Sequence, residues 1–123
     1  MKIFTGYFAK LKQYKEAGLI PVAISRGVPD FCQDIDRLEM FQPSFQTLID
    51  YKYKRITEKE YTQQYGRDIL YYLDAETIYE MLVKKYKGQD IVLLCYESPN
   101  FFCHRHLVAQ WFNNNGIHVK EYE

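Results

Sequence analysis

The chain has 123 residues and a mass of 14.8 kDa, close to the commonest size of one folded domain, which leaves no room for a second catalytic domain. Hydrophobic residues make up 47% and charged residues 26%, proportions that exclude an intrinsically disordered protein. Lys plus Arg total 16 and Asp plus Glu total 16, so no global positive field favours a general nucleic-acid coat. We therefore predict one domain over residues 1–123.

The first third of the chain is predicted to alternate strand and helix. Residues 1–5 are a short strand, and apolar residues at helical spacing predict a helix over 7–17 that Gly18 ends. Residues 20–25 are a second strand. The acidic segment 30–40 is expected to be a loop with a short helical turn.

The middle of the chain is predicted to be helical. Pro43 is expected in the first turn of a helix whose apolar residues lie at 45, 48, 49 and 53. Thr57 and Glu60 match a capping box, which predicts a helix from there to about residue 73. Asp74 is suited to cap another helix, which Gly88 ends.

The last third returns to strands. Residues 91–95 are a continuous apolar run too short for a helix, which is typical of a strand buried on both faces. A loop over 97–102 leads to a helix over 103–114, and residues 117–122 alternate as a last strand. This order predicts an α/β fold, a single domain with a mostly parallel sheet flanked by helices in a Rossmann-like three-layer sandwich.

The cysteines and the apolar pattern bear on the cellular compartment. No apolar run approaches the roughly 18 residues that span a bilayer, and lysines interrupt the first residues where a secretory signal would be apolar. We expect a cytoplasmic protein that does not bind membranes. Cys32, Cys95 and Cys103 show no disulfide framework spacing, so we expect reduced thiols.

Two polar segments follow predicted strands, where parallel α/β sheets bind ligands. Arg26 follows the second strand, and Glu97 follows the buried strand and precedes Cys103, His104 and Arg105 at a helix start. If these strands are neighbours, both segments meet in one crevice. Helical phase at about 100° per residue places His104 on the inward face, with Cys103 and Arg105 on its flanks, and His106 toward solvent.

These residue types suit the handling of an anion and of protons. Arg26 and Arg105 can bind a phosphate or carboxylate, and Glu97 or His104 can move protons. Cys103 lies where a helix N-terminus lowers a thiol pKa, so it can act as a nucleophile. The structural alternatives are a half-buried His104 bonded to a strand carbonyl and an Arg105 paired with Glu97.

A metal site is the rival interpretation of the same residues. Cys95, Cys103, His104 and Cys32 offer sulfur and nitrogen ligands, but their spacing matches no usual zinc pattern, so we predict no metal. The chain also lacks the glycine-rich motifs of dinucleotide and P-loop sites, and no cofactor is predicted.

Two motifs, Leu93-Leu94-Cys95-Tyr96-Glu97 and Cys103-His104-Arg105, resemble those of the domain of unknown function 488 family. The segments 4–10, 24–29 and 60–65 extend this similarity over nearly the whole chain. The chain departs from the family pattern in Phe41-Gln42-Pro43, where a Leu-x-Pro is usual, and in a long approach to the second motif. The resemblance implies a small prokaryotic or viral α/β domain. It indicates the fold, whereas the biochemical role of the family is largely unassigned.

We expect an enzyme or enzyme-derived domain that binds an anionic small molecule, such as a nucleotide, at the carboxyl ends of the strands. The alternative is a non-catalytic module that binds nucleic acid or a protein through an aromatic and basic surface. The 12 Tyr and 8 Phe supply such a surface, although tyrosine rings commonly pack at the rim of a core. The sequence does not identify a reaction or an oligomeric state.

Overall fold

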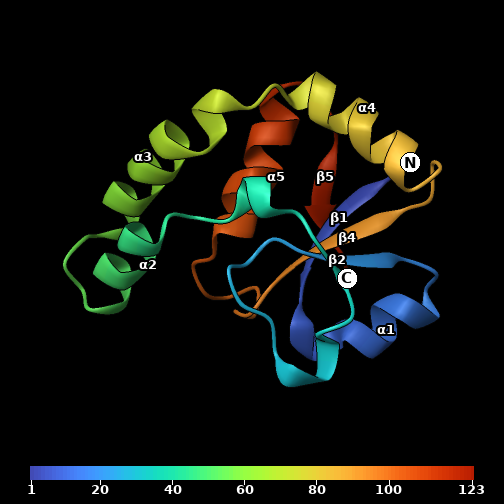
Figure 1. Ribbon diagram of the computed structural model, residues 1–123, viewed down its shortest axis with the longest axis horizontal. Helices are drawn as coiled ribbons and strands as arrows, with labels where there is room; N and C mark the ends of the chain where they lie inside the picture. Colours follow the sequence, from blue (N-terminus) through green and yellow to red (C-terminus); the bar gives the residue numbers. More distant parts are fainter.

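The computed structural model describes residues 1–123, and its five strands form one sheet. The strand order is β3-β2-β4-β1-β5, and every neighbouring pair is parallel. The strands are β1 (Ile3–Tyr7), β2 (Ile20–Ala23), β3 (Asp36–Arg37), β4 (Ile91–Cys95) and β5 (Val119–Glu121). Figure 1 shows β4 between β1 and β2, so the predicted parallel sheet with a central apolar strand is confirmed.

Five α-helices connect and flank these strands (Figure 1). They are α1 (Leu11–Glu16), α2 (Phe45–Lys52), α3 (Glu58–Asp68), α4 (Ala75–Lys85) and α5 (His104–Asn114). Short 3-10 turns precede α1 at Phe8–Lys10 and follow α3 at Leu70–Tyr72.

The central strand buries both of its faces, because helices cover the sheet on both sides. Ile91, Leu93 and Cys95 join a core cluster with residues of α3, α4 and α5. Val92 and Leu94 join the opposite cluster, which α1 and the segment 28–35 complete. All five residues of β4 are buried. The three-layer sandwich expected from the sequence is therefore confirmed.

Local capping explains where three helices begin. Thr57 and Glu60 form the predicted capping box at α3, with reciprocal bonds of 3.0 and 3.1 Å between side chain and backbone. The Asp74 carboxylate accepts the Thr77 N–H at the start of α4. Pro43, which we predicted inside the first turn of α2, lies outside the helix. Ser44 caps α2 instead, because its hydroxyl accepts the Thr47 N–H.

Further boundaries differ from the sequence analysis. The helix predicted over 7–17 begins as a 3-10 turn and is α-helical over Leu11–Glu16, and the strands predicted over 20–25 and 117–122 are the shorter Ile20–Ala23 and Val119–Glu121. The acidic segment contains the two-residue strand β3, since Asp36 and Arg37 pair beside Val22 and Ala23 of β2. The helix predicted over 57–73 ends at Asp68 and continues as a 3-10 turn. Strand β1 extends to Tyr7, because pairing with β4 continues to Cys95. Such pairings depend on neighbours distant in sequence, which local patterns do not show.

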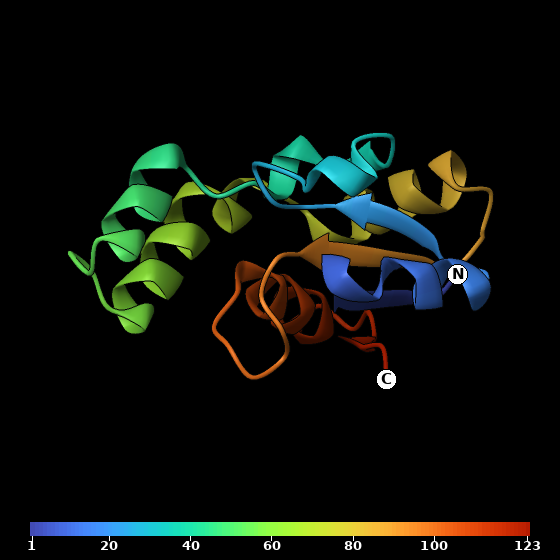
Figure 2. The same ribbon diagram turned by 90° about the horizontal axis from the view of Figure 1, so that it is seen from below.

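Helices α2 and α3 lie beyond the carboxyl ends of the strands. Figure 2 shows this pair at the side toward which the arrowheads of β2 and β4 point. The carboxyl ends of these strands, the start of α5 and the α2–α3 pair therefore enclose one region. None of the helices combines the length and the apolar character needed to cross a membrane.

Candidate functional site

The carboxyl ends of β2 and β4 are side by side. This is the condition under which the two polar segments were expected to meet in one crevice. The strands pair directly, with Val22 beside Leu93 and Ala23 beside Leu94. Cys103 is the N-cap of α5, and the next residue, His104, places its Nε2 2.7 Å from the carbonyl oxygen of Ile24. The segments after β2 and β4 are thus joined by a direct hydrogen bond.

That bond requires a proton on Nε2 of the His104 ring. A carbonyl oxygen only accepts hydrogen bonds, so Nε2 is the nitrogen that donates. The side chain is buried, and the Tyr65 ring packs at 5.5 Å between centroids. The remaining nitrogen, Nδ1, lies 4.0 Å from the Cys103 sulfur. His104 is therefore bonded to a strand carbonyl, as the structural alternative held, and at the same time faces a thiol.

Cys95 and Cys103 form a buried pair of thiols with opposite acidities. The pKa of Cys103 is lowered by the adjacent Cys95 thiol, by His104 and by the backbone N–H of Arg105, which together outweigh burial. The pKa of Cys95 is raised by burial and by the neighbouring charge on Cys103. Cys95 consequently keeps its proton and stabilises Cys103 as a thiolate.

Glu97 and Cys103 open onto the same small cavity of about 60 Å³. Its walls come from helix α2, helix α3 and the loop before α5, and the lining residues are Leu48, Tyr51, Tyr61, Glu97, Phe102, Cys103 and His104. Partial burial, together with the charge of Cys103, raises the pKa of the Glu97 carboxyl. This group therefore holds a proton to higher pH than an ordinary glutamate does and can act as an acid.

The cavity walls include residues that the sequence analysis did not assign to the site. Tyr51, Tyr61 and Phe102 pack edge to face at ring distances of 5.0 to 5.4 Å. Tyr51 and Tyr61 lie within helices and Phe102 lies in the loop before α5, and no local signal distinguishes the three from core residues. Only the packing of α2 and α3 over the carboxyl edge brings them to His104.

Arg105 does not present its guanidinium to a ligand, so the expected anion-binding role does not fit this geometry. Its Nε and Nη2 donate to the two carboxylate oxygens of Glu121 at 3.1 and 3.0 Å. Its Nη1 donates to the carbonyl oxygen of Glu97 at 2.6 Å. The side chain is 0% exposed. Arg105 thus connects the loop at Glu97 to β5. The structural alternative from the sequence expected an ion pair with Glu97, but the ion pair is formed with Glu121.

Arg26 is exposed and forms no salt bridge. Its one hydrogen bond runs from Nη1 to the carbonyl oxygen of Pro43 at 3.2 Å, which leaves the other guanidinium donors free. It follows Ile24, the residue whose carbonyl holds His104, by two positions. Arg26 therefore keeps free guanidinium donors, whereas those of Arg105 are used within the protein.

The expectation that His106 faces solvent is wrong. The residue is only partly exposed, and its Nε2 atom is buried without a hydrogen-bond partner. Burial and the nearby Arg105 lower its pKa. The phase argument assumed one buried face, but α5 packs against β1, β4, β5 and α3, which together enclose more of its first turn.

Cys95, Cys103 and His104 place three potential metal-binding atoms within 4.8 Å of one another. The Cys95 sulfur lies 3.6 and 3.7 Å from the two ring nitrogens of His104. An ion on Nδ1 lies along the lone pair of that nitrogen, which points away from Nε2, so a sulfur bonded to the ion would be much farther from Nε2 than from Nδ1. The Cys95 sulfur is almost equally distant from both. An ion bound to Nδ1 would therefore need Cys95 to turn, so the three side chains do not fit a tetrahedral zinc site as they stand.

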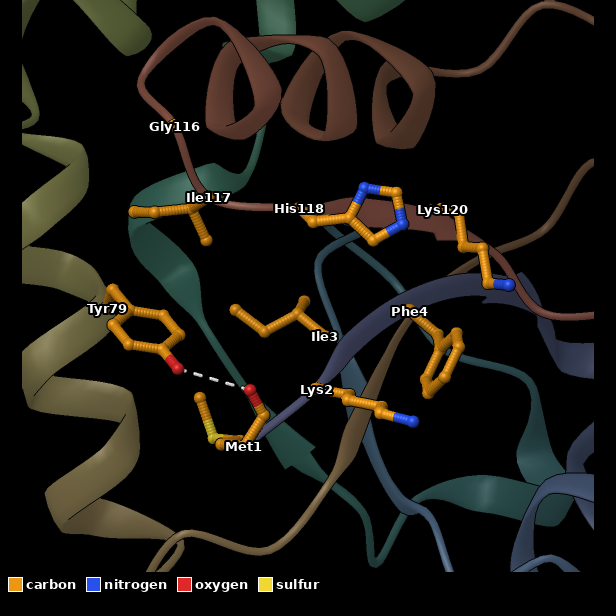
Figure 3. A pocket seen from close by; sticks show the side chains of 9 residues that line it. All are labelled: Met1, Lys2, Ile3, Phe4, Tyr79, Gly116, Ile117, His118 and Lys120. Atoms are coloured by element: carbon orange, nitrogen blue, oxygen red, sulfur yellow. Dashed lines mark hydrogen bonds between the residues drawn. The ribbon is translucent and has the colours of Figure 1, made fainter.

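A second depression of about 460 Å³ lies at the opposite end of the sheet, beside the start of β1. Figure 3 shows the side chains of Lys2, Phe4 and Lys120 extending to the same side, and His118 nearby. Phe4 and Lys120 are register partners on β1 and β5. The Tyr79 hydroxyl closes the other side of the depression by donating to the Met1 carbonyl at 3.1 Å. This surface combines basic and aromatic side chains.

Comparison with known proteins gives one family match. The family described as "DUF488-N3a: Active DUF488-N3 subclade" matches residues 21–116, a range that holds all five of the predicted site residues. No curated protein and no solved structure matches the chain.

Proposed function

The chain belongs to the DUF488-N3a family, and from this premise and the site geometry we propose that it is an enzyme with Cys103 as its nucleophile. The observation that carries the proposal is the position of Cys103, whose sulfur lies within 4.8 Å of Cys95 and His104 and which lines the same cavity as Glu97. These neighbours lower the pKa of the Cys103 thiol. Nucleophile and acid thus meet at one point, as covalent catalysis requires.

The substrate that we propose is an anionic small molecule of the nucleotide type. Arg26 and the backbone N–H groups at the start of α5 supply positive potential at the carboxyl edge of the sheet. The cavity of about 60 Å³ is far smaller than the roughly 300–1,000 Å³ of typical small-molecule sites. Only the reacting group enters it, and the anionic part of the substrate remains outside, toward Arg26.

The chemistry follows from the acidities of the groups. The Cys103 sulfur forms a bond to an electrophilic atom of the substrate while the bond to the leaving group breaks. Glu97 in its protonated form gives its proton to the leaving group, and the resulting carboxylate then activates the water that releases the product from sulfur. His104 turns Nδ1 toward the sulfur and stabilises the thiolate when this nitrogen also carries a proton, and the carbonyl of Ile24 orients its ring.

Ligand binding and adduct formation test this proposal separately. Nucleotides and phosphorylated metabolites are screened by thermal shift, since a ligand of the native state raises the melting midpoint. We expect one ligand class to shift the wild type and to lose its effect in Arg26→Ala, but not in Arg55→Ala, an exposed arginine in the connection between α2 and α3. Intact-mass analysis then seeks a covalent adduct that Cys103→Ser abolishes and Glu97→Gln slows.

The proposal fails if turnover of an identified substrate survives in both Cys103→Ser and Glu97→Gln. Circular dichroism of each variant shows that the fold is retained, so that a loss of activity is assigned to the side chain and not to unfolding.

A second candidate function rests on the surface at the amino end of the sheet. Lys2, His118 and Lys120 surround Phe4 there, a combination that suits phosphates and a stacked base of single-stranded nucleic acid (Figure 3). Binding of a fluorescent oligonucleotide that Lys2→Glu with Lys120→Glu removes, and that Lys59→Glu on α3 leaves intact, supports this function. Absence of binding at low salt excludes it.

A further inference from the structure

The site contains a second thiol, Cys95, which takes no part in the chemical steps proposed for Cys103. It ends β4, is 1% exposed and contacts both ring nitrogens of His104 at 3.6 and 3.7 Å. Its sulfur and the Cys103 sulfur lie within 4.8 Å of each other. The third cysteine, Cys32, belongs to the core cluster on the other face of the sheet, where its thiol donates to the Pro29 carbonyl. The fold therefore pairs two of the three cysteines and isolates the third.

Access to the two sulfurs is unequal. Cys103 lines the cavity of about 60 Å³, whereas Cys95 does not. A space of this size holds molecules close in size to water, of which a liquid molecule occupies about 30 Å³. Hydrogen peroxide is of that size, and bulky oxidants are not. A small peroxide therefore reaches Cys103 first and finds Cys95 directly behind it.

We propose that Cys95 and Cys103 form a reversible disulfide when a small hydroperoxide enters the cavity, and that this oxidation switches the site off. The inference rests on the proposed function in one respect, namely that Cys103 is the nucleophile of the site. It adds a modification site, the class of its oxidant and a role for Cys95.

The oxidation proceeds in two steps. The Cys103 thiolate attacks one oxygen of hydrogen peroxide, so that an S–O bond forms, the O–O bond breaks and hydroxide leaves. The Cys95 sulfur then attacks the sulfur of the resulting sulfenic acid. The S–S bond forms as the S–O bond breaks, and the departing hydroxide takes the Cys95 proton and leaves as water. Two thiols are oxidised and one peroxide is reduced.

The placement of the two residues favours bond formation. Cys95 is held on the central strand, while Cys103 ends the loop that connects β4 to α5, outside regular structure. An S–S bond is about 2.0 Å long, so one sulfur has to approach the other. Rotation of the Cys103 side chain toward β4 provides this approach and withdraws the sulfur from the cavity. A dithiol reductant restores both thiols by exchange.

The experiment uses the reduced wild-type chain and hydrogen peroxide as the probe, and after the peroxide is removed the chain is unfolded in urea and its free thiols are blocked by N-ethylmaleimide. Trypsin cuts after Lys87 and Arg105, so one peptide, residues 88–105, contains both cysteines. We expect this peptide to lose about 2 Da, the mass of two thiol hydrogens, and to carry no maleimide. Dithiothreitol is expected to reverse the change, and Cys32 is expected to be blocked at all times.

Single variants assign the order of events. Cys95→Ser is expected to stop at a Cys103 sulfenic acid that dimedone traps, and Cys103→Ser is expected to show neither product. Cys32→Ser is the matched control and is expected to oxidise as the wild type does. Circular dichroism shows whether each variant is folded. The presence or absence of the disulfide is read from the peptide map of the wild type and does not depend on the folding of the variants.

Two results overturn the inference, and each leaves the proposed function separately testable. The first is a peptide 88–105 in which both thiols remain open to maleimide after peroxide treatment, although iodoacetamide still selectively alkylates Cys103. The second is a disulfide that includes Cys32. A Cys95–Cys103 disulfide together with full turnover of a substrate by Cys103→Ser would refute the proposed function and retain the oxidation.

Discussion

Removal of the Glu121 carboxylate should destabilise the protein strongly, because it leaves the Arg105 guanidinium buried and unpaired. Glu121 accepts bonds from Arg105 Nε and Nη2 at 3.1 and 3.0 Å and from the Thr5 hydroxyl at 2.7 Å. The Arg105 side chain is 0% exposed and that of Glu121 is 19% exposed. In Glu121→Ala the guanidinium would keep only the Glu97 carbonyl as a hydrogen-bond acceptor.

The expected loss is set by the cost of an uncompensated buried charge. Breaking a buried ion pair by removing one partner costs about 3–5 kcal/mol. Because water reaches Glu121, we expect the lower end, about 3 kcal/mol, which is a large share of the roughly 5–15 kcal/mol that stabilises a domain. Urea denaturation followed by circular dichroism measures this loss, and Glu80→Ala on the exposed face of α4 is the control, expected within about 0.5 kcal/mol of wild type.

A double variant separates the charge from its environment. Arg105→Met with Glu121→Leu removes both charges, so it should be less destabilised than Glu121→Ala alone. A loss below about 1 kcal/mol in Glu121→Ala would refute the reasoning. It would mean that the Arg105 guanidinium reaches water or other acceptors once the carboxylate is removed.

Three further predictions concern the thiol, a helix cap and a close contact. Because its pKa is lowered, Cys103 should react with iodoacetamide at nearly constant rate down to well below pH 8, whereas Cys32, whose pKa burial raises, should react only in alkaline solution; a mass-resolved pH profile shows both. Thr57→Ala should cost about 1 kcal/mol in urea denaturation, since it removes the capping box of α3, and an unchanged midpoint would show that the cap is dispensable. Gly6→Ala should cost about 2 kcal/mol or more by the same assay, because the added methyl group overlaps the buried Tyr14 ring, and a neutral result would mean that this ring moves freely.

Local chemistry explains most of what the sequence predicted about the fold. The Thr57 capping box, the Asp74 cap and the apolar run 91–95 each depend on residues close together in the chain, and each was found where it was predicted. The small strand β3 was missed because its two residues are exposed and have no apolar alternation. Their strand character exists only through pairing with β2.

The candidate site divides in the same way. The sequence by itself placed Glu97, Cys103 and His104 at the end of the central strand, because a buried apolar run followed by a polar loop and a helix start is a local pattern. Only the tertiary structure decided what these groups contact: Ile24 is 80 residues from His104 along the chain, and Glu121 is 16 residues from Arg105. A side chain becomes a proton carrier, a thiolate or a buried structural ion through the partners and the burial that surround it, and those are properties of the folded chain.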